Sequence, residues 1–132
     1  MRYRSYIEPL LERSDREIYT IKVENSRGPI LLLSGQDDQQ WLSERMATLI
    51  EGRLKDKNYP YEVRNVIYPD AGHWLLSFKD SYPIIASSFF RNRGMNINGK
   101  YYQFENGGTA WGTMVARRNT RKETLQFLKQ FK

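Results

Sequence analysis

The 132-residue sequence contains no cysteine and a single histidine, His73. Without cysteine, the chain has no disulfide, no thiolate metal ligand and no cysteine nucleophile of its own. One imidazole and scattered carboxylates, with no calcium-loop spacing, predict no metal site and no cofactor. The glycine-rich fingerprints of dinucleotide-binding and phosphate-binding loops are also missing.

Long hydrophobic runs are missing as well. No apolar stretch approaches the roughly 18 residues that cross a bilayer. The segment Met1–Ser5 does not begin an apolar core of signal-peptide length, so we expect a cytoplasmic protein without a membrane partner. Hydrophobic residues make up only 39% of the chain, but 9 Tyr, 6 Phe and 3 Trp allow a modest core. The length favours a single domain over residues 1–132.

The formal net charge is +6 at pH 7. Much of the excess lies near the end of the chain, in Arg117, Arg118, Arg121, Lys122, Lys129 and Lys132. Such a balance occurs in proteins that bind nucleic acids or other anions, and it also arises from ordinary solubility. Because no nucleic-acid-binding motif accompanies the charge, we do not expect a nucleic-acid partner.

The most informative stretch is Pro29–Asp38, with the sequence PILLLSGQDD. Four consecutive apolar residues predict a strand buried on both faces of a parallel sheet, and the following glycine and carboxylates predict a tight turn. An apolar stripe at helical spacing predicts a helix over 41–55, and β-branched and aromatic residues predict a second strand over 61–68. The sequence therefore predicts a right-handed βαβ unit over 29–68, in an α/β fold.

The flanking segments carry weaker signals. We predict a short helix within 2–18, with Pro9 in its first turn, and an extended segment over 19–24. An irregular and hairpin region is expected over 74–106, with Asn98-Gly99 as a two-residue hairpin turn. A terminal helix over 110–131 is expected to begin at the N-cap Thr109. Its predicted buried face consists of Trp111, Met114, Val115, Leu125, Leu128 and Phe131.

Two turns follow the two predicted parallel strands, and both lie at the same edge of the sheet. The first carries Asp37 and Asp38, and the second carries Asp70 and His73. Because adjacent strands lie about 4.8 Å apart, a carboxylate from one turn and the imidazole from the other are expected to meet. A lone histidine is often only structural, but a neighbouring aspartate orients an imidazole as a base. We assign this orienting role to Asp38, capping of the helix mainly to Asp37, and turn formation to Asp70, which stays an alternative partner.

The same residues carry a family resemblance. The run Gly28–Asp38, then Trp41 and Ser43, the segment Tyr68–His73, and Gly107-Gly108-Thr109 before a helix ending in Phe127-Leu128 occur in this order. Together they resemble the C-terminal part of an α/β-hydrolase of the acyl-CoA thioester hydrolase and bile acid-CoA:amino acid N-acyltransferase (dienelactone-hydrolase-like) family, over about residues 16–131. Leu42 and Arg121 depart from that family's usual Pro and Trp.

The resemblance implies a three-layer αβα arrangement in which the two strands are the last two of an eight-stranded sheet. It implies a catalytic triad with Asp38 as acid and His73 as base, and cleavage of thioesters or esters, or acyl transfer, through an acyl-enzyme. The family's nucleophile lies on a Gly-x-Ser-x-Gly elbow, which this sequence lacks. We therefore expect a truncated hydrolase that is inactive alone. An acyl-CoA or ester is expected to be a substrate only of the intact enzyme.

The expected partners follow from the half-sheet. A strand over 30–34 with an unpaired edge favours a homodimer, or pairing with a complementary upstream half that holds the nucleophile. The alternative to an enzyme part is a non-catalytic interaction module that uses this edge. The basic terminal helix could also attract the phosphates of coenzyme A, and the sequence does not distinguish this role from nucleic-acid binding or ordinary solubility.

Overall fold

The computed structural model describes residues 4–75 and 92–131. The elements are α1 (Arg4–Leu11), α2 (Arg16–Tyr19), the 3-10 helix η1 (Val23–Asn25), β1 (Ile30–Gly35), α3 (Ser43–Asp56), β2 (Val63–Tyr68), β3 (Asn92–Ile97), β4 (Lys100–Glu105) and α5 (Ala110–Lys129). Most of the segment predicted to be irregular, 74–88, lies outside the described residues.

The two central strands pair in parallel, as the sequence predicts. Their register runs from Ile30 opposite Val63 to Gly35 opposite Tyr68, and α3 connects them. Since successive side chains on a strand point to opposite faces, Leu31 and Leu33 face one side of the sheet, and Ile30, Leu32 and Ser34 face the other. This βαβ unit brings the two strand ends, and the turns that follow them, to one edge of the sheet.

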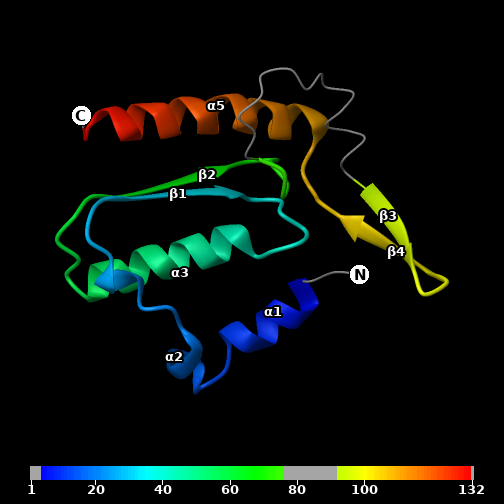
Figure 1. Cartoon of the computed structure of the whole chain (residues 1–132), viewed down its shortest axis with the longest axis horizontal. Helices are drawn as coiled ribbons and strands as arrows, with labels where there is room; N and C mark the ends of the chain where they lie inside the picture. The colour runs from blue at the N-terminus through cyan, green and yellow to red at the C-terminus, as the bar shows by residue number, and fades with distance from the viewer. Residues whose placement is uncertain (1–3, 76–91, 132) are drawn as a thin grey trace.

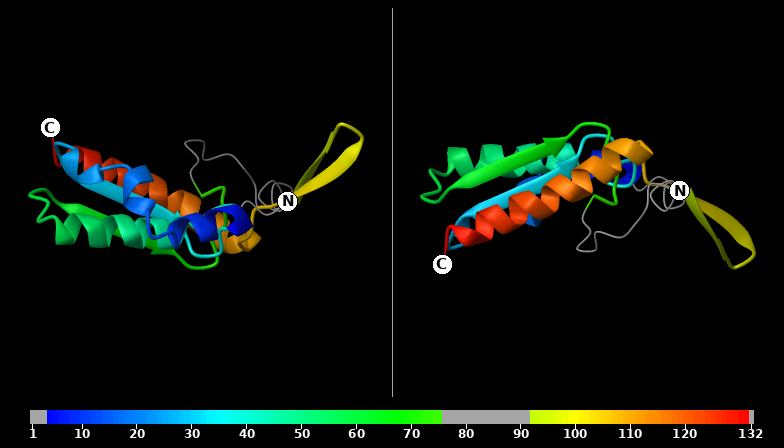
Figure 2. Two further views of the ribbon diagram at one scale, coloured as in Figure 1. Left: turned by 90° about the horizontal axis from the view of Figure 1, so that it is seen from below. Right: turned by 90° about the horizontal axis from the view of Figure 1, so that it is seen from above.

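Helices cover both faces of the strand pair (Figure 1), which gives a three-layer αβα arrangement. On one face, Tyr68, Ala71, Leu75 and Ala116 of α5 form a buried cluster against Leu33 and Val66. Views from above and below place α5 toward the β1 side of the pair and α3 toward the β2 side (Figure 2). Burial in this cluster raises the pKa of the Tyr68 hydroxyl.

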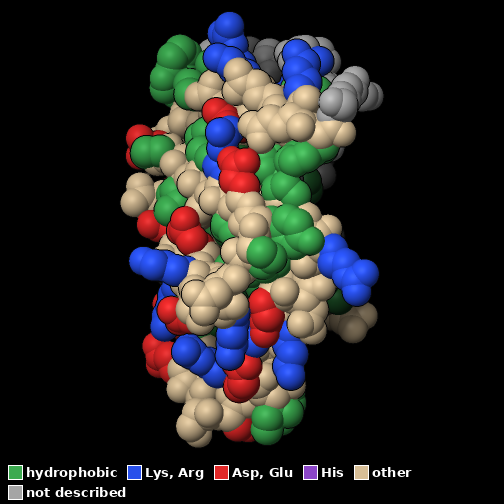
Figure 3. Space-filling view, turned by 90° about the vertical axis from the view of Figure 1, so that its left-hand side faces the viewer, with side chains coloured by type: hydrophobic (Ala, Val, Ile, Leu, Met, Phe, Trp, Pro, Cys, Tyr) green, Lys and Arg blue, Asp and Glu red, His purple; other side chains and the backbone are tan. Residues whose placement is uncertain are grey.

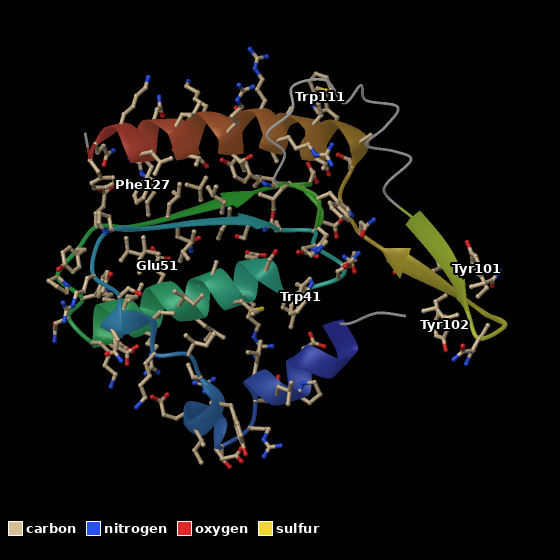
Figure 4. All side chains as sticks on the ribbon, in the orientation of Figure 1. Trp41, Glu51, Tyr101, Tyr102, Trp111 and Phe127 are labelled. Atoms are coloured by element: carbon tan, nitrogen blue, oxygen red, sulfur yellow. The ribbon has the colours of Figure 1, made fainter. Side chains whose placement is uncertain are left out.

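Side-chain hydrogen bonds tie each helix to β2. Asn65 donates its Nδ2 to Glu51 of α3 at 2.9 Å, and Arg64, on the opposite face, donates to Glu123 of α5 at 3.1 Å. Glu51 points from α3 toward the strands in Figure 4. The two polar residues of β2 therefore bond to one helix each. Val66 and Tyr68 pack in the apolar cluster between the sheet and α5.

The terminal helix begins as the sequence predicts but buries a different face. Thr109 is its N-cap, with the side-chain oxygen accepting a hydrogen bond from the Gly112 N–H. The buried residues are Thr113, Ala116, Thr120 and Phe127, whereas Trp111 is 65% exposed and Leu128 is 56% exposed. Figure 4 shows Trp111 turned away from the strands and Phe127 turned toward them. The predicted face was wrong because most of the buried positions of α5 carry small side chains, which do not stand out in an apolar stripe.

The N-terminal segment also differs from expectation. Two short helices replace the single one, Pro9 lies inside α1, and η1 takes the last two residues of the segment predicted to be extended, 19–24. Arg53 of α3 explains the arrangement, because its guanidinium pairs with Glu17 at 2.7 Å and with Glu24 at 2.6 Å. These hydrogen bonds lower the pKa of Glu24 to about 2 and also lower that of Glu17. Glu17 and Glu24 therefore face α3. The alternation of apolar and polar residues in the sequence does not reveal this pairing with a distant arginine.

The predicted hairpin is present and projects away from the rest of the chain (Figures 1 and 2). β3 and β4 pair antiparallel from Asn92–Glu105 to Ile97–Lys100. The turn residues Asn98 and Gly99 have φ angles of 52° and 76°, the left-handed conformation that a two-residue hairpin turn requires.

The surface in Figure 3 carries acidic and basic side chains next to each other, with apolar side chains exposed between them. Arg53 and Arg64 each form an ion pair with a glutamate. The net positive charge of the sequence is therefore interrupted by acidic groups on that face. Among the helices in the described part of the chain, none is long and apolar enough to cross a membrane.

Candidate functional site

The two turns at the carboxyl ends of β1 and β2 are held together by backbone hydrogen bonds. The Gln36 N–H donates to the Tyr68 carbonyl and the Asp37 N–H to the Ala71 carbonyl, each at 3.0 Å. Gly35 allows this approach, since a Cβ there would lie 2.5 Å from the Ala71 oxygen. The close packing of backbone against backbone sets the positions of the residues that follow.

The Asp38 carboxylate and the His73 ring meet across these turns. Asp38 Oδ2 lies 3.1 Å from His73 Nδ1, and the Asp38 side chain is 4% exposed, against 28% for His73. A carboxylate accepts hydrogen bonds, so this contact matches the imidazole tautomer with its proton on Nδ1, in which Nε2 keeps a lone pair. The predicted meeting of the acid and the imidazole is confirmed.

Asp38 also holds the turn between β1 and α3. Its second oxygen, Oδ1, accepts the N–H groups of Gln40 and Trp41, each at 2.9 Å, in the turn that leads to α3. Asp37 instead accepts the N–H of Gly108 at 2.8 Å, so the prediction that Asp37 caps the helix was wrong. Neither carboxylate caps α3, whose N-cap is Leu42, and Asp38 points inward with both of its oxygens occupied.

Asp70 serves as a turn residue, as predicted. Its φ angle is 55°, in the left-handed region, and its backbone carbonyl accepts the Thr109 N–H at 2.8 Å. Asp38, and not Asp70, is the carboxylate at hydrogen-bond distance from His73 Nδ1.

A third segment of the site, Asn106–Gly108, was not predicted from the sequence. The His73 N–H donates to the Asn106 carbonyl at 2.8 Å, and Asp38 and Gly107 form an isolated antiparallel bridge. Gly107 and Gly108 have φ angles of 67° and 70°. The sequence pattern indicated only a loop before the terminal helix. The adjacent glycines are the signal that could have found the segment, because residues without a Cβ allow one backbone to approach another closely.

One aromatic side chain, that of Trp74, lies against the imidazole. The Trp74 ring lies edge-on to the His73 ring, with centroids 5.8 Å apart and an angle of 82° between the planes. Trp41, which follows the Asp38 turn, is 43% exposed, and Trp74 is 47% exposed. The exposed side of the histidine therefore has an apolar neighbour.

An apolar groove of about 600 Å³ lies elsewhere, between the N-terminal segment and α3. Its lining consists of Leu10, Leu11, Arg13, Arg16, Glu17, Tyr19, Thr20, Ile21, Val23, Met46, Leu49, Ile50 and Arg53. Neither Asp38 nor His73 lines this groove, so the contact between them lies outside it. Within residues 4–75 and 92–131, no group of three or more histidine or carboxylate side chains could hold a metal ion.

Comparison with known proteins identifies the family of the chain. Residues 1–131 match the family model described as BAAT / acyl-CoA thioester hydrolase C terminal. Comparison with curated proteins gave no match. The family match spans the βαβ unit, the hairpin and the terminal helix, and it agrees with the resemblance seen in the sequence. The chain therefore belongs to the BAAT / acyl-CoA thioester hydrolase C-terminal family, with the fold of the C-terminal part of an α/β-hydrolase.

Proposed function

We propose that Asp38 and His73 are the acid and the base of a Ser/Cys-His-Asp triad that hydrolyses acyl thioesters or esters, or transfers their acyl group. The observation that carries this proposal is the 3.1 Å contact between Asp38 Oδ2 and His73 Nδ1, made by a carboxylate that is 4% exposed. A buried acid on Nδ1 leaves Nε2 as the atom that accepts a proton from a nucleophile. Family membership supports the choice of an acyl-CoA substrate.

The proposed reaction has two steps. In the first, Nε2 takes the proton of a serine or cysteine, whose oxygen or sulfur attacks the acyl carbon, and the imidazolium then protonates the departing thiolate or alkoxide. In the second, Nε2 takes a proton from water or an amine, which attacks the acyl-enzyme, and the imidazolium returns the proton to the serine or cysteine as its bond to the acyl carbon breaks. Asp38 stabilises the imidazolium in both steps and keeps the ring in one tautomer.

The nucleophile in this proposal lies outside the 132 residues. The sequence contains no Gly-x-Ser-x-Gly elbow, and the acid and base stand at the ends of β1 and β2. A strand that extended the sheet beyond β1 would end at the same edge and could carry the nucleophile there. We therefore expect the chain alone to release no burst of product from an acyl-CoA or a nitrophenyl ester.

A chimera tests this proposal. Residues 1–131 would replace the corresponding C-terminal part of an active acyl-CoA thioester hydrolase, and thiol release from an acyl-CoA would be followed. Because general base catalysis contributes about 10²- to 10⁴-fold, we expect His73→Ala and Asp38→Asn each to reduce kcat by that range. Asp70→Asn is the matched control and should keep the rate within about threefold.

Two results would contradict the proposal. One is a folded chimera in which His73→Ala hydrolyses acyl-CoA as fast as the unmodified protein. The other is a product burst from the isolated chain that His73→Ala abolishes, because it would place a nucleophile within these residues.

A second candidate function is a non-catalytic module that pairs with a second copy through β1. The Ile30 N–H donates to Glu62 and the Gln36 N–H to Tyr68, so alternate N–H groups face β2 and that of Leu31 faces the opposite edge. In the described part of the chain, β1 pairs only with β2. An unpaired edge of six residues with apolar side chains favours pairing across a two-fold axis.

Proline substitutions test this second candidate. Leu31→Pro removes an outward N–H and should convert a dimer to a monomer with an unchanged circular dichroism spectrum. Leu32→Pro removes an N–H that faces β2 and should disrupt the fold. Light scattering that reports a monomer for the unmodified chain at high concentration would exclude pairing through this edge.

A further inference from the structure

The segment Asn106–Gly108 lies between the turn that carries Asp38 and the loop that carries His73, and it bonds to both. We propose that this segment, together with Asp37, is a positioning clamp that sets the separation between the acid and the base. The inference rests on the proposed function of Asp38 and His73, and it adds positioning residues to that site. It is carried by backbone contacts and one carboxylate.

On the histidine side, the clamp holds the backbone. The His73 N–H donates to the Asn106 carbonyl at 2.8 Å, and Asn106 is 3% exposed. Gly72 lies directly against the clamp, because a Cβ on Gly72 would lie 2.5 Å from the Gly107 carbonyl carbon and overlap its oxygen. The Gly72 N–H also faces Thr113 Oγ1 of α5 at 3.3 Å. The Cα of His73 therefore has little freedom to move relative to Asn106.

On the aspartate side, the clamp holds side chains as well. Asp37 Oδ2 accepts the Gly108 N–H at 2.8 Å, and the backbones of Asp38 and Gly107 form the antiparallel bridge. The Gln40 Nε2 donates to Asn106 Oδ1, and the Gln40 backbone N–H donates to Asp38 Oδ1 at 2.9 Å. Asp37 thus holds the segment Asn106–Gly108 in place, although it does not contact His73.

A clamp of this kind has a clear physical purpose. Asp38 and His73 are 35 positions apart in the sequence, on two separate turns. A displacement of about 1 Å in such a pair is enough to cost roughly 10²-fold in rate. Hydrogen bonds from a third segment to both turns remove the relative motion that would open the contact.

The experiment uses His73 as its own reporter, because it is the only histidine in the chain. Imidazole ¹⁵N NMR at pH 8.5 measures which ring nitrogen carries the proton, and exchange of the Nδ1 proton with water measures how often the contact opens. The test variants are Asp37→Ala and Asn106→Ala. Asp37→Asn keeps an acceptor oxygen for the Gly108 N–H, and Asp56→Ala makes the same change at an exposed position at the end of α3.

If the clamp positions the pair, the unmodified chain and Asp56→Ala hold the proton on Nδ1. Asp37→Ala and Asn106→Ala then retain their circular dichroism spectra but populate both tautomers, with Nδ1 exchange faster by about tenfold, the factor that corresponds to about 1.4 kcal/mol. Asp37→Asn restores most of the slow exchange.

Two outcomes overturn the clamp. One is unchanged tautomer and exchange in both alanine variants. The other is a change that appears only when both variants lose their folded spectra, which indicates a purely structural role. A folded chimera in which His73→Ala keeps the full rate, together with faster Nδ1 exchange in Asp37→Ala, would refute the proposed reaction and leave the clamp standing.

Discussion

Replacement of Gly107 by alanine is the sharpest test of the packing at the site. Gly107 has a φ angle of 67°, so an alanine there adopts the left-handed conformation, which costs about 1–2 kcal/mol. An added Cβ would also lie 3.0 Å from the carbonyl carbon of Asp37, and closer still to its oxygen. Because the Cβ meets the backbone of Asp37 and not a flexible side chain, the segment around Gly107 and the turn that carries Asp37 must move apart.

The size of the effect follows from the bonds that this movement breaks. The Gly108 N–H loses the Asp37 carboxylate, and a hydrogen bond to a charged group contributes about 1.5–3 kcal/mol. Together with the conformational cost, we expect Gly107→Ala to lower the free energy of unfolding by about 3–5 kcal/mol. That is a large part of the roughly 5–15 kcal/mol by which domains are stable.

Gly99 provides the matched control. It also has a positive φ angle, 76°, but no atom lies within 4 Å of where its Cβ would be. Gly99→Ala should therefore cost only the conformational part, about 1–2 kcal/mol. Urea unfolding followed by circular dichroism measures both variants, and with a slope of about 2 kcal/mol/M the two midpoints should differ by about 0.8–1.5 M.

The reasoning would be refuted by equal destabilisation in the two variants at equal slopes. Equal values would mean that the segment around Gly107 separates from Asp37 without cost. The backbone bridge between Asp38 and Gly107 would then contribute nothing to the position of the acid.

Three further predictions concern the rest of the chain. Gly52 lies inside α3 with open space around its Cβ position, so Gly52→Ala should raise the free energy of unfolding by about 0.5–1 kcal/mol in urea titrations. Leu54 is 1% exposed and Leu49 is 39% exposed on the same helix, so Leu54→Ala should cost about 2–5 kcal/mol and Leu49→Ala far less. Folding lowers the pKa of Glu24 from 4.5 to about 2 through its hydrogen bonds to Arg53, so this pair stabilises the fold above pH 4.5 and loses that contribution as the pH falls toward 2. Arg53→Met should therefore lower the thermal midpoint near neutral pH and flatten its decline in acid, and a decline as steep as in the unmodified chain would contradict the assignment.

The amino-acid sequence by itself determined the elements whose signals are local. The apolar run of β1, the helical stripe of α3 and the Asn98-Gly99 turn each follow from a few neighbouring residues. The meeting of Asp38 and His73 also followed, because parallel neighbouring strands have only one way to place their carboxyl ends. Local chemistry and simple topology were sufficient for these features.

The tertiary structure decided the features that depend on distant segments. The buried side of α5 was decided by how closely a helix with Ala116 and Thr120 approaches the sheet, although larger apolar residues lie on its other faces. The division of roles between Asp37 and Asp38 depended on Gly108, which follows them by about 70 positions. Which of two adjacent carboxylates turns inward is set by the partner that the fold brings to it, and no spacing within the turn itself carries that information.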